Sequence, residues 1–248
     1  MMGKLDLILN DLETLHVKPR VISDKRTLHS YIKNIYEPML DYLINPKIVL
    51  EIGVLHGVSL AMWSWCFPNS KIIAADILLN PNLSPAFKEL VEQKKIELLI
   101  GDAYSPDFLT MLPEQVDLMI DDGPHTLESQ IRFLSYRKKL AKDGILVIED
   151  IKDGANSIRK LLSTLKSEEK KQAIAVPLMY RTGRYDDLVL IYSKNVDVIN
   201  FYTNSISKMN SILISSPILF ALSKPYIFLI RCMCYLGKKI NQKSLTLS

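Results

Sequence analysis

The chain has 248 residues, of which 48% are apolar and 23% are charged, and its formal net charge is +4. This composition allows a buried core and excludes a disordered chain, and the charge is too mild to indicate a nucleic-acid-binding protein. The three cysteines, Cys66, Cys232 and Cys234, form neither a zinc motif nor a disulfide framework, which indicates a reducing cytoplasm.

The predicted elements begin with a mixed helical segment over residues 1–46 and continue as strands that alternate with helices. Short apolar runs predict strands at residues 48–53, 71–76, 96–100, 116–121 and 145–150. Helices are predicted at residues 59–66, 84–94, 108–112, 127–141 and 157–166. The stop signal of the fourth helix is Lys142-Asp143-Gly144, and two closing strands follow at residues 173–178 and 188–192.

This alternation predicts parallel βαβ units in an α/β fold. The expected architecture is a Rossmann-like, doubly wound, mostly parallel seven-stranded sheet with an N-terminal helical cap and a C-terminal helical tail. The cap would cover residues 1–46, the sheet domain residues 47–194 and the tail residues 195–248. The chain length suits one large domain with such appendages.

The tail is apolar over residues 212–235, but prolines and basic residues interrupt it: Pro217, Lys224, Pro225 and Arg231. A membrane-spanning helix needs roughly 20 apolar residues with few charges, so a simple span is not expected. One interpretation is a helical pair that packs on the domain or on a second subunit. The other is a peripheral contact of residues 212–243 with an anionic membrane surface, because three lysines follow the apolar run.

A glycine turn follows the first predicted strand, in the sequence Glu51-Ile52-Gly53-Val54-Leu55-His56-Gly57. Gly53 and Gly57 let the backbone approach a ligand closely and turn into a helix. Their spacing lacks the dinucleotide fingerprint, and the chain has no Gly-Lys-Ser/Thr phosphate loop. His56, inside the turn, is interpreted as a pocket-wall residue.

Acids end the next two predicted strands. Asp76 stands where a carboxylate can accept hydrogen bonds from both hydroxyls of a ribose. Asp102, after the third strand, can accept a hydrogen bond from an adenine amino group. Each of these residues taken singly has the alternative interpretation of an ordinary strand-end turn, but their succession favours a nucleotide-like pocket.

Polar residues also end the fourth and fifth predicted strands, as Asp121-Asp122-Gly123-Pro124-His125 and Glu149-Asp150. Adjacent parallel strands bring their carboxyl ends to one crevice, so three carboxylates and an imidazole are expected to converge there. Like charges that close repel each other, and a hard divalent cation is the simplest way to hold them together. Asp121 should point away from Asp122 and is interpreted as structural. The alternatives are strand-end caps without a metal and, for His125, a helix cap.

The glycine turn and the two following strand-end acids resemble the class I S-adenosylmethionine-dependent methyltransferases. The later acids and histidine resemble a narrower group, the metal-dependent sugar O-methyltransferases of macrolide biosynthesis and the related cephalosporin hydroxylase family. The resemblance implies that Asp122, Glu149 and Asp150 hold Mg²⁺ and that His125 is the base. It also implies an S-adenosyl-L-methionine site that includes Glu51, Gly53, Gly57, Asp76 and Asp102.

The segment from Ser23 to Tyr31, followed by Tyr36-Glu37, is similar to the Thr-Asp-Lys…His-x-Tyr…Tyr segment that precedes the sheet in those enzymes. The similarity implies that Lys25, His29 and Tyr31 form a lid over the cofactor. Ser23 replaces the threonine, and Arg26 stands where glycine is usual. The alternative for the two aromatic side chains and His29 is plain packing.

The resemblance covers residues 22–192 and implies a Mg²⁺-dependent transfer of a methyl group from S-adenosyl-L-methionine to a sugar hydroxyl. The acceptor would be a small molecule, such as a nucleotide sugar, a glycoside or a surface-glycan intermediate, and a homo-oligomer stays open. A catechol-like acceptor, a non-catalytic S-adenosylmethionine-binding protein and a membrane scaffold based on the tail are the rival interpretations. Tyr185-Asp186-Asp187 either enters the pocket or starts the last strand.

Overall fold

The computed structural model describes residues 3–14, 23–27, 29–178 and 186–215. It contains a seven-stranded sheet with the order β3-β2-β1-β4-β5-β7-β6. The strands are β1 (Ile48–Ile52), β2 (Lys71–Asp76), β3 (Ile96–Ile100), β4 (Val116–Asp121), β5 (Leu140–Ile148), β6 (Ala173–Pro177) and β7 (Leu188–Ser193). β1 to β5 pair in parallel, whereas β7 runs antiparallel to both β5 and β6. The predicted Rossmann-like, mostly parallel sheet is therefore confirmed.

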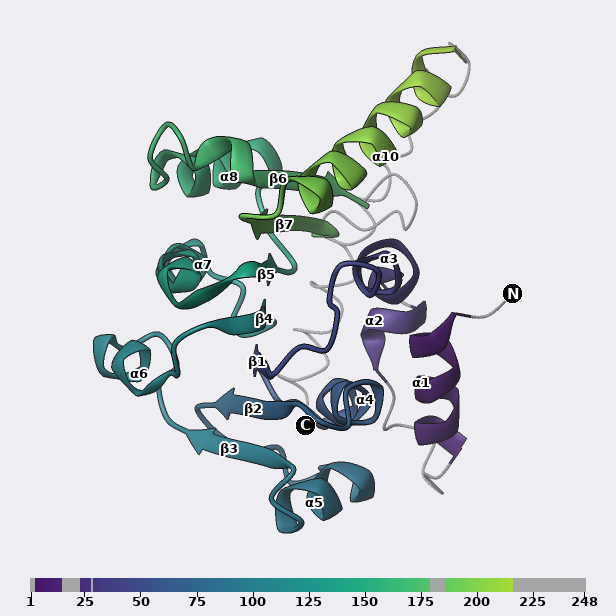
Figure 1. Ribbon diagram of the computed structural model, residues 1–248, viewed down its shortest axis with the longest axis vertical. Helices are drawn as coiled ribbons and strands as arrows, with labels where there is room; N and C mark the ends of the chain where they lie inside the picture. Colours follow the sequence, from purple (N-terminus) through teal and green to yellow (C-terminus); the bar gives the residue numbers. More distant parts are fainter. Residues whose placement is uncertain (1–2, 15–22, 28, 179–185, 216–248) are drawn as a thin grey trace, which may run out of the picture.

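Helices cover both faces of the sheet (Figure 1). One face carries α1 (Lys4–Thr14), η1 (Ile32–Tyr36), α3 (Glu37–Met39), α4 (Val58–Cys66), α5 (Pro85–Glu92) and α10 (Val196–Ser215). The other face carries α6 (Pro106–Met111), α7 (Leu127–Leu134) and α8 (Gly154–Ser163). Shorter turns are α2 (Asp24–Thr27), η2 (Ser135–Lys139) and η3 (Lys170–Gln172). Strands that are covered on both sides read as continuous apolar runs, which is why β1, β4 and β5 were recognisable in the sequence.

The strand order reverses between β1 and β4, since β1 pairs with β2 on one side and with β4 on the other. Ile52 lies opposite Asp121, so these two strands end at the same level. Ligands of open α/β sheets bind outside the carboxyl ends of the strands at such a reversal. The sheet therefore presents one preferred crevice, beside the residues that follow β1 and β4.

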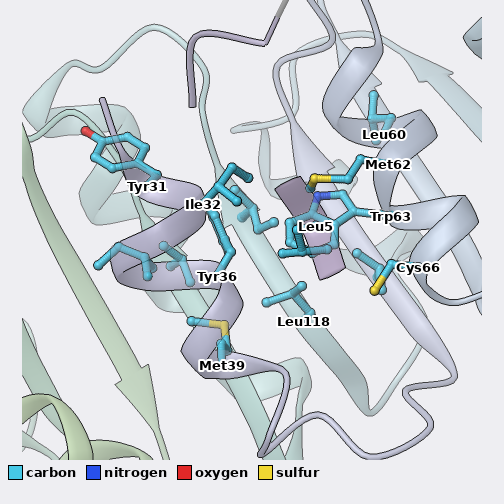
Figure 2. Close-up of a cluster of buried hydrophobic side chains, with 14 of the residues drawn as sticks. Leu5, Tyr31, Ile32, Tyr36, Met39, Leu60, Met62, Trp63, Cys66 and Leu118 are labelled. Atoms are coloured by element: carbon cyan, nitrogen blue, oxygen red, sulfur yellow. The ribbon is translucent and has the colours of Figure 1, made fainter. Parts of the chain in front are cut away.

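The N-terminal segment shares its core with the sheet. Leu5, Tyr36 and Trp63 belong to one buried cluster, which Figure 2 shows together with its neighbours. The rings of Tyr36 and Trp63 meet edge to face, with centroids 5.1 Å apart. Glu37 accepts a hydrogen bond from the backbone N–H of Leu5 at 2.9 Å, which caps the start of α1. Packing of this kind fixes the N-terminal segment over the same sheet edge as the crevice.

One predicted helix was wrong at its C-terminal end. The helix expected over residues 127–141 ends at Leu134, is followed by η2, and gives way to β5 at Leu140. Leu140 pairs with Val116 and is buried, and the register then shifts before Leu118. This irregularity leaves Lys142 and Asp143 exposed inside the strand, so their polar run resembles a helix stop in the sequence.

The tail begins as predicted with a helix, α10, whose Val198 and Tyr202 pack in the same core cluster. The stretch predicted to touch a membrane, residues 212–243, lies outside the described residues except for the last turn of the α10 backbone. Within the described ranges, no helix combines the length and apolar character needed to cross a bilayer.

Candidate active site

A cavity of about 690 Å³ opens at the carboxyl ends of the central strands. Six of the residues predicted from the sequence line it together: Gly53, Asp76, Asp102, Asp122, His125 and Asp150. They follow β1, β2, β3, β4 and β5, so they come from five separate strand ends. The parallel topology thus converts a recurring local pattern into one shared site.

The glycine turn is required by close approaches of the backbone. Gly53 has φ +97°, and a Cβ there would lie 2.1 Å from the carbonyl oxygen of Asp122. Gly57 has φ +75°, and a Cβ there would lie 2.3 Å from the ring of Phe87. Gly57 and His56 line a smaller adjoining cavity, and the His56 Nδ1 lies 3.0 Å from the carbonyl oxygen of Asn82. Only glycine allows the β1 turn to touch the end of β4.

Asp76 and Asp102, which the sequence predicts to recognise a nucleoside, both line the cavity. Asp76 accepts hydrogen bonds from the backbone N–H of Val54 at 2.8 Å and of Leu78 at 3.2 Å, which fixes its carboxylate at the cavity wall. Asp102 is exposed and accepts a hydrogen bond from the N–H of Tyr104 at 2.9 Å. Both carboxylates therefore face the cavity in set orientations.

Asp76→Asn is expected to weaken S-adenosyl-L-homocysteine binding by about 10- to 100-fold. Hydrogen bonds to a charged group contribute about 1.5–3 kcal/mol, and the amide offers one acceptor where the carboxylate offers two. Calorimetric titration measures the change. Asp117→Asn is the matched control, because Asp117 accepts hydrogen bonds from the N–H groups of Lys47 and Ile48 outside the cavity lining. Equal losses in both variants would contradict a ribose-binding role.

The described residues that line the cavity do not include Glu51, which was predicted to bind the cofactor. The side chain of Glu51 is fully buried. It accepts hydrogen bonds from the Ser59 hydroxyl and the Trp63 indole N–H, both at 2.7 Å. Burial raises the pKa of Glu51, and the ammonium of Lys25, 3.6 Å away, opposes that rise. The structure thus places Glu51 behind the site, among groups that hold α4 and α2.

Asp122, His125 and Asp150 form the polar centre of the cavity. The His125 Nε2 lies 3.8 Å from Asp122 Oδ1 and 3.7 Å from Asp150 Oδ2. Potential ligand atoms of these three residues all lie within 4.8 Å of one another. Thr126, rather than His125, caps α7 by accepting a hydrogen bond from the N–H of Ser129 at 3.1 Å. His125 is therefore free of a capping role and faces the cavity.

The backbone at this centre is strained. His125 has φ +54° and Asp150 has φ +51°, which places two residues with side chains in the left-handed region. Such conformations cost on the order of 1–3 kcal/mol each and cluster at functional sites. The strain turns both side chains toward the same space and supports a functional reading of these strand ends.

Glu149, the third predicted metal ligand, is placed differently. Its side chain is buried and accepts hydrogen bonds from the ammonium of Lys25 and the hydroxyl of Tyr36. Glu149 turns toward the N-terminal segment, whereas Asp150, whose backbone is in the left-handed region, lines the cavity. Burial raises the pKa of Glu149 well above its usual value, and Lys25 opposes this effect.

Three N-terminal residues were predicted to form a lid over the cofactor, and each of them contacts a carboxylate. The Lys25 Nζ lies 2.5 Å from Asp122 Oδ2 and also binds Glu149. Burial by itself lowers the pKa of Lys25, but the surrounding carboxylates outweigh burial and raise it well above its usual value. The Tyr31 hydroxyl donates to Asp150, and the His29 Nδ1 lies 2.6 Å from an oxygen of Asp187. Lys25 lines the small adjoining cavity, whereas His29 and Tyr31 are absent from both described linings.

Two side chains near the site were missed or left open by sequence reasoning. Tyr104 lines the cavity, and its hydroxyl donates to Asp121, the residue interpreted as structural. Burial raises the pKa of Asp121 to about 7. Asp187 is fully buried against His29, while Tyr185 lies outside the described residues. Neither Tyr104 nor Asp187 belongs to a motif, so no sequence signal distinguished them from packing residues.

Comparisons with known proteins agree on the fold. No protein-family model matches the sequence, and the search of curated proteins found no match. The S-adenosylhomocysteine-bound methyltransferase PaMTH1 of Podospora anserina is similar, with a TM-score of 0.50, 16% identity and coverage of 78% of this chain and 88% of that one. Fibrillarin of Aeropyrum pernix, solved with natively bound S-adenosyl-L-methionine, is also similar. Its TM-score is 0.50 at 16% identity, and the alignment covers 67% of this chain and 74% of fibrillarin.

MycE, a methyltransferase of the mycinamycin biosynthetic pathway solved with Mg and S-adenosylhomocysteine, is a weaker structural match. Its TM-score is 0.47 at 21% identity, and the alignment covers 76% of this chain but only 49% of MycE. This chain thus spans about half the length of that enzyme. The two likenesses with a TM-score of 0.50 show the class I S-adenosylmethionine-dependent methyltransferase fold alone. The MycE match carries no conclusion about the acceptor or a metal.

Proposed function

We propose that this protein is a Mg²⁺-dependent O-methyltransferase that transfers a methyl group from S-adenosyl-L-methionine to a sugar hydroxyl. One observation carries the proposal. The turn and acids suited to a nucleoside, Gly53, Asp76 and Asp102, line the same cavity as the Asp122–His125–Asp150 centre. A methyl donor and a deprotonating group would then meet within one cavity.

The cofactor end of the cavity supports this reading. The cavity volume of about 690 Å³ lies within the range of small-molecule sites, roughly 300–1,000 Å³. Asp76 would accept hydrogen bonds from the ribose hydroxyls, and Asp102 from the adenine amino group. Gly53 brings the β1 backbone close to the centre, where the methionine part of the cofactor would lie.

The acidic end fits a hard dication. Asp122 Oδ1 and Asp150 Oδ2 face the space beside His125 Nε2. Carboxylate oxygens are the ligands that Mg²⁺ prefers. The ion pairs of Lys25 are with Glu51, Asp122 Oδ2 and Glu149, whereas Asp122 Oδ1 and Asp150 Oδ2 lie beside His125. A bound Mg²⁺ would lower the pKa of a coordinated hydroxyl and make it a better nucleophile.

His125 supplies the base of the proposed reaction. Its Nε2 would take the proton of the acceptor hydroxyl while the hydroxyl oxygen forms a bond to the methyl carbon. The bond between that carbon and the sulfonium sulfur breaks, and the sulfur leaves as the neutral thioether of S-adenosyl-L-homocysteine. Asp122 Oδ1 and Asp150 Oδ2 lie 3.8 Å and 3.7 Å from this same nitrogen, and their charges would stabilise the protonated ring.

The residues that line the cavity favour a sugar over a flat aromatic diol as the acceptor. In the described lining, Tyr104 is the only Phe, Trp or Tyr side chain. A catechol would be expected to stack between aromatic side chains. Adjacent sugar hydroxyls need polar partners instead, which Asp122 and Asp150 provide.

An acceptor screen tests the proposal directly. The protein is incubated with S-adenosyl-L-methionine carrying a labelled methyl group, Mg²⁺, and separate panels of nucleotide sugars, glycosides and catechols. We expect label in at least one sugar and none in the catechols. Transfer to catechols alone would support the aromatic alternative, and cofactor binding without any transfer would support the non-catalytic one.

A further inference from the structure

Lys25 is a buried cation among the acids of the site. Its side chain is 2% exposed, and its Nζ lies 2.5 Å from Asp122 Oδ2, 3.6 Å from Glu51 Oε1 and in direct contact with Glu149 Oε2. An ammonium already stands, therefore, between two of the three carboxylates that the sequence assigned to Mg²⁺. The three predicted ligands are divided between two cation positions.

Both oxygens of Glu149 have protein partners. Oε2 accepts from Lys25, and Oε1 accepts from the hydroxyl of Tyr36. Tyr36 is itself fixed, because it is fully buried and packs edge to face on Trp63 (Figure 2). Among the residues that the structure describes, Glu149 is not part of either cavity lining. Its carboxylate therefore binds groups in the protein interior and does not face the cavity.

The oxygens that face the cavity belong to the other two acids. Asp122 binds Lys25 through Oδ2 and presents Oδ1 toward His125. Asp150 receives the Tyr31 hydroxyl on Oδ1 and presents Oδ2 toward His125. Each acid thus has one oxygen held by the N-terminal segment and one directed to the cavity centre.

Lys25 is held in this place from outside the site as well. The neighbouring Arg26 forms ion pairs with Asp6 at 3.3 Å and Glu13 at 2.9 Å, both on α1. These contacts pin the single turn of α2 between α1 and the strand ends.

We propose that Lys25 is a positioning residue. By binding the Glu149 carboxylate, it keeps Glu149 away from the divalent cation, which is held by Asp122 and Asp150. The proposal rests on the proposed function, because it concerns the cation of that same site. Removal of the ammonium would release the Glu149 carboxylate and add a ligand to the cation. Lys25 therefore keeps the cation site weaker and more open than a three-carboxylate site, with positions left for the acceptor.

Mn²⁺ affinity, measured by electron paramagnetic resonance on the full chain, tests this assignment. Glu149→Gln keeps one oxygen that can accept from Lys25, and its amide NH2 can donate to the Tyr36 hydroxyl oxygen. We expect the Kd to stay within about threefold of the unchanged protein. Asp150→Asn should raise the Kd by at least about tenfold, since changes in and around a metal's ligands cost 10- to 100-fold. Glu169→Gln is the matched control, because Glu169 is also ion-paired, with Arg137 on η2.

A double-mutant cycle gives the second arm. Lys25→Met is expected to tighten Mn²⁺ binding by about tenfold, and Glu149→Gln in that background should remove the gain. Should Lys25→Met fail to fold, the comparison of Glu149→Gln with Asp150→Asn decides alone. A tenfold loss in Glu149→Gln, or unchanged or weaker binding in folded Lys25→Met, overturns the proposal.

S-adenosyl-L-homocysteine binding, measured in parallel by calorimetry, separates this inference from the proposed function. If the unchanged protein binds S-adenosyl-L-homocysteine but no Mn²⁺, the metal dependence of the proposed function fails, and the assignment of Lys25 fails with it. If the unchanged protein binds both and Glu149→Gln loses Mn²⁺, only the assignment of Lys25 fails.

Discussion

Chelation of divalent cations is expected to lower the methyl-transfer rate by at least about 10³-fold, and added Mg²⁺ should restore it. Lewis-acid assistance of this kind contributes several kcal/mol, and each 1.36 kcal/mol is tenfold in rate. Asp122 and Asp150, whose carboxylates lie near His125 Nε2, would hold the cation, which would supply Lewis-acid assistance to the acceptor hydroxyl. The measurement is the initial rate with the acceptor found in the screen, in excess chelator and after Mg²⁺ is returned.

The binding of S-adenosyl-L-homocysteine serves as the control for chelation. Asp76 and Asp102, which would hold the nucleoside, lie at the ends of β2 and β3. They accept hydrogen bonds from backbone N–H groups, so their positions do not depend on Asp122 or Asp150. The Kd for S-adenosyl-L-homocysteine should therefore change little when the cation is removed. A full rate in excess chelator would remove the metal from the mechanism.

His125→Asn is expected to lower kcat by about 10²–10⁴-fold, the usual contribution of a positioned general base. Asparagine is the appropriate replacement, because residue 125 has φ +54° and asparagine tolerates this conformation better than alanine does. The substitution removes the nitrogen that lies 3.8 Å from Asp122 Oδ1 and 3.7 Å from Asp150 Oδ2. Steady-state kinetics give the change in kcat.

Glu128→Gln is the matched control for this substitution. Glu128 lies on the first turn of α7, three residues after His125, and pairs with Arg132 at the surface. Its replacement should leave kcat unchanged. The Kd for S-adenosyl-L-homocysteine should also stay within about twofold in His125→Asn, because a base acts in the chemical step rather than in cofactor binding. A small kcat effect alongside a large loss of cofactor affinity would assign His125 to binding.

The strand ends were predictable because their signals are local. Gly53 and Asp76 each stand directly after a short apolar run, and Asp122 stands one residue further, after Asp121. Parallel pairing brings such ends to one edge regardless of the loops between them. The start of β5 was not predictable, because the exposed Lys142 and Asp143 interrupt the apolar pattern at a register shift. The position of a register shift depends on the partner strand, and the sequence of one segment does not specify which strand pairs with it.

The amino-acid sequence by itself determined the α/β architecture, the order of acids and glycines along the strand ends, and six of the residues that line the cavity. The tertiary structure alone decided the partners of Glu51 and Glu149. The Lys25 that binds Glu149 is 124 residues away in the chain, and Tyr36 is 113 residues away. The physical reason is that periodicity reports which face of an element a side chain occupies, whereas the charge it meets there depends on how distant segments pack. Glu149 and Asp150 are neighbours in sequence, yet one faces a buried ammonium and the other an open cavity.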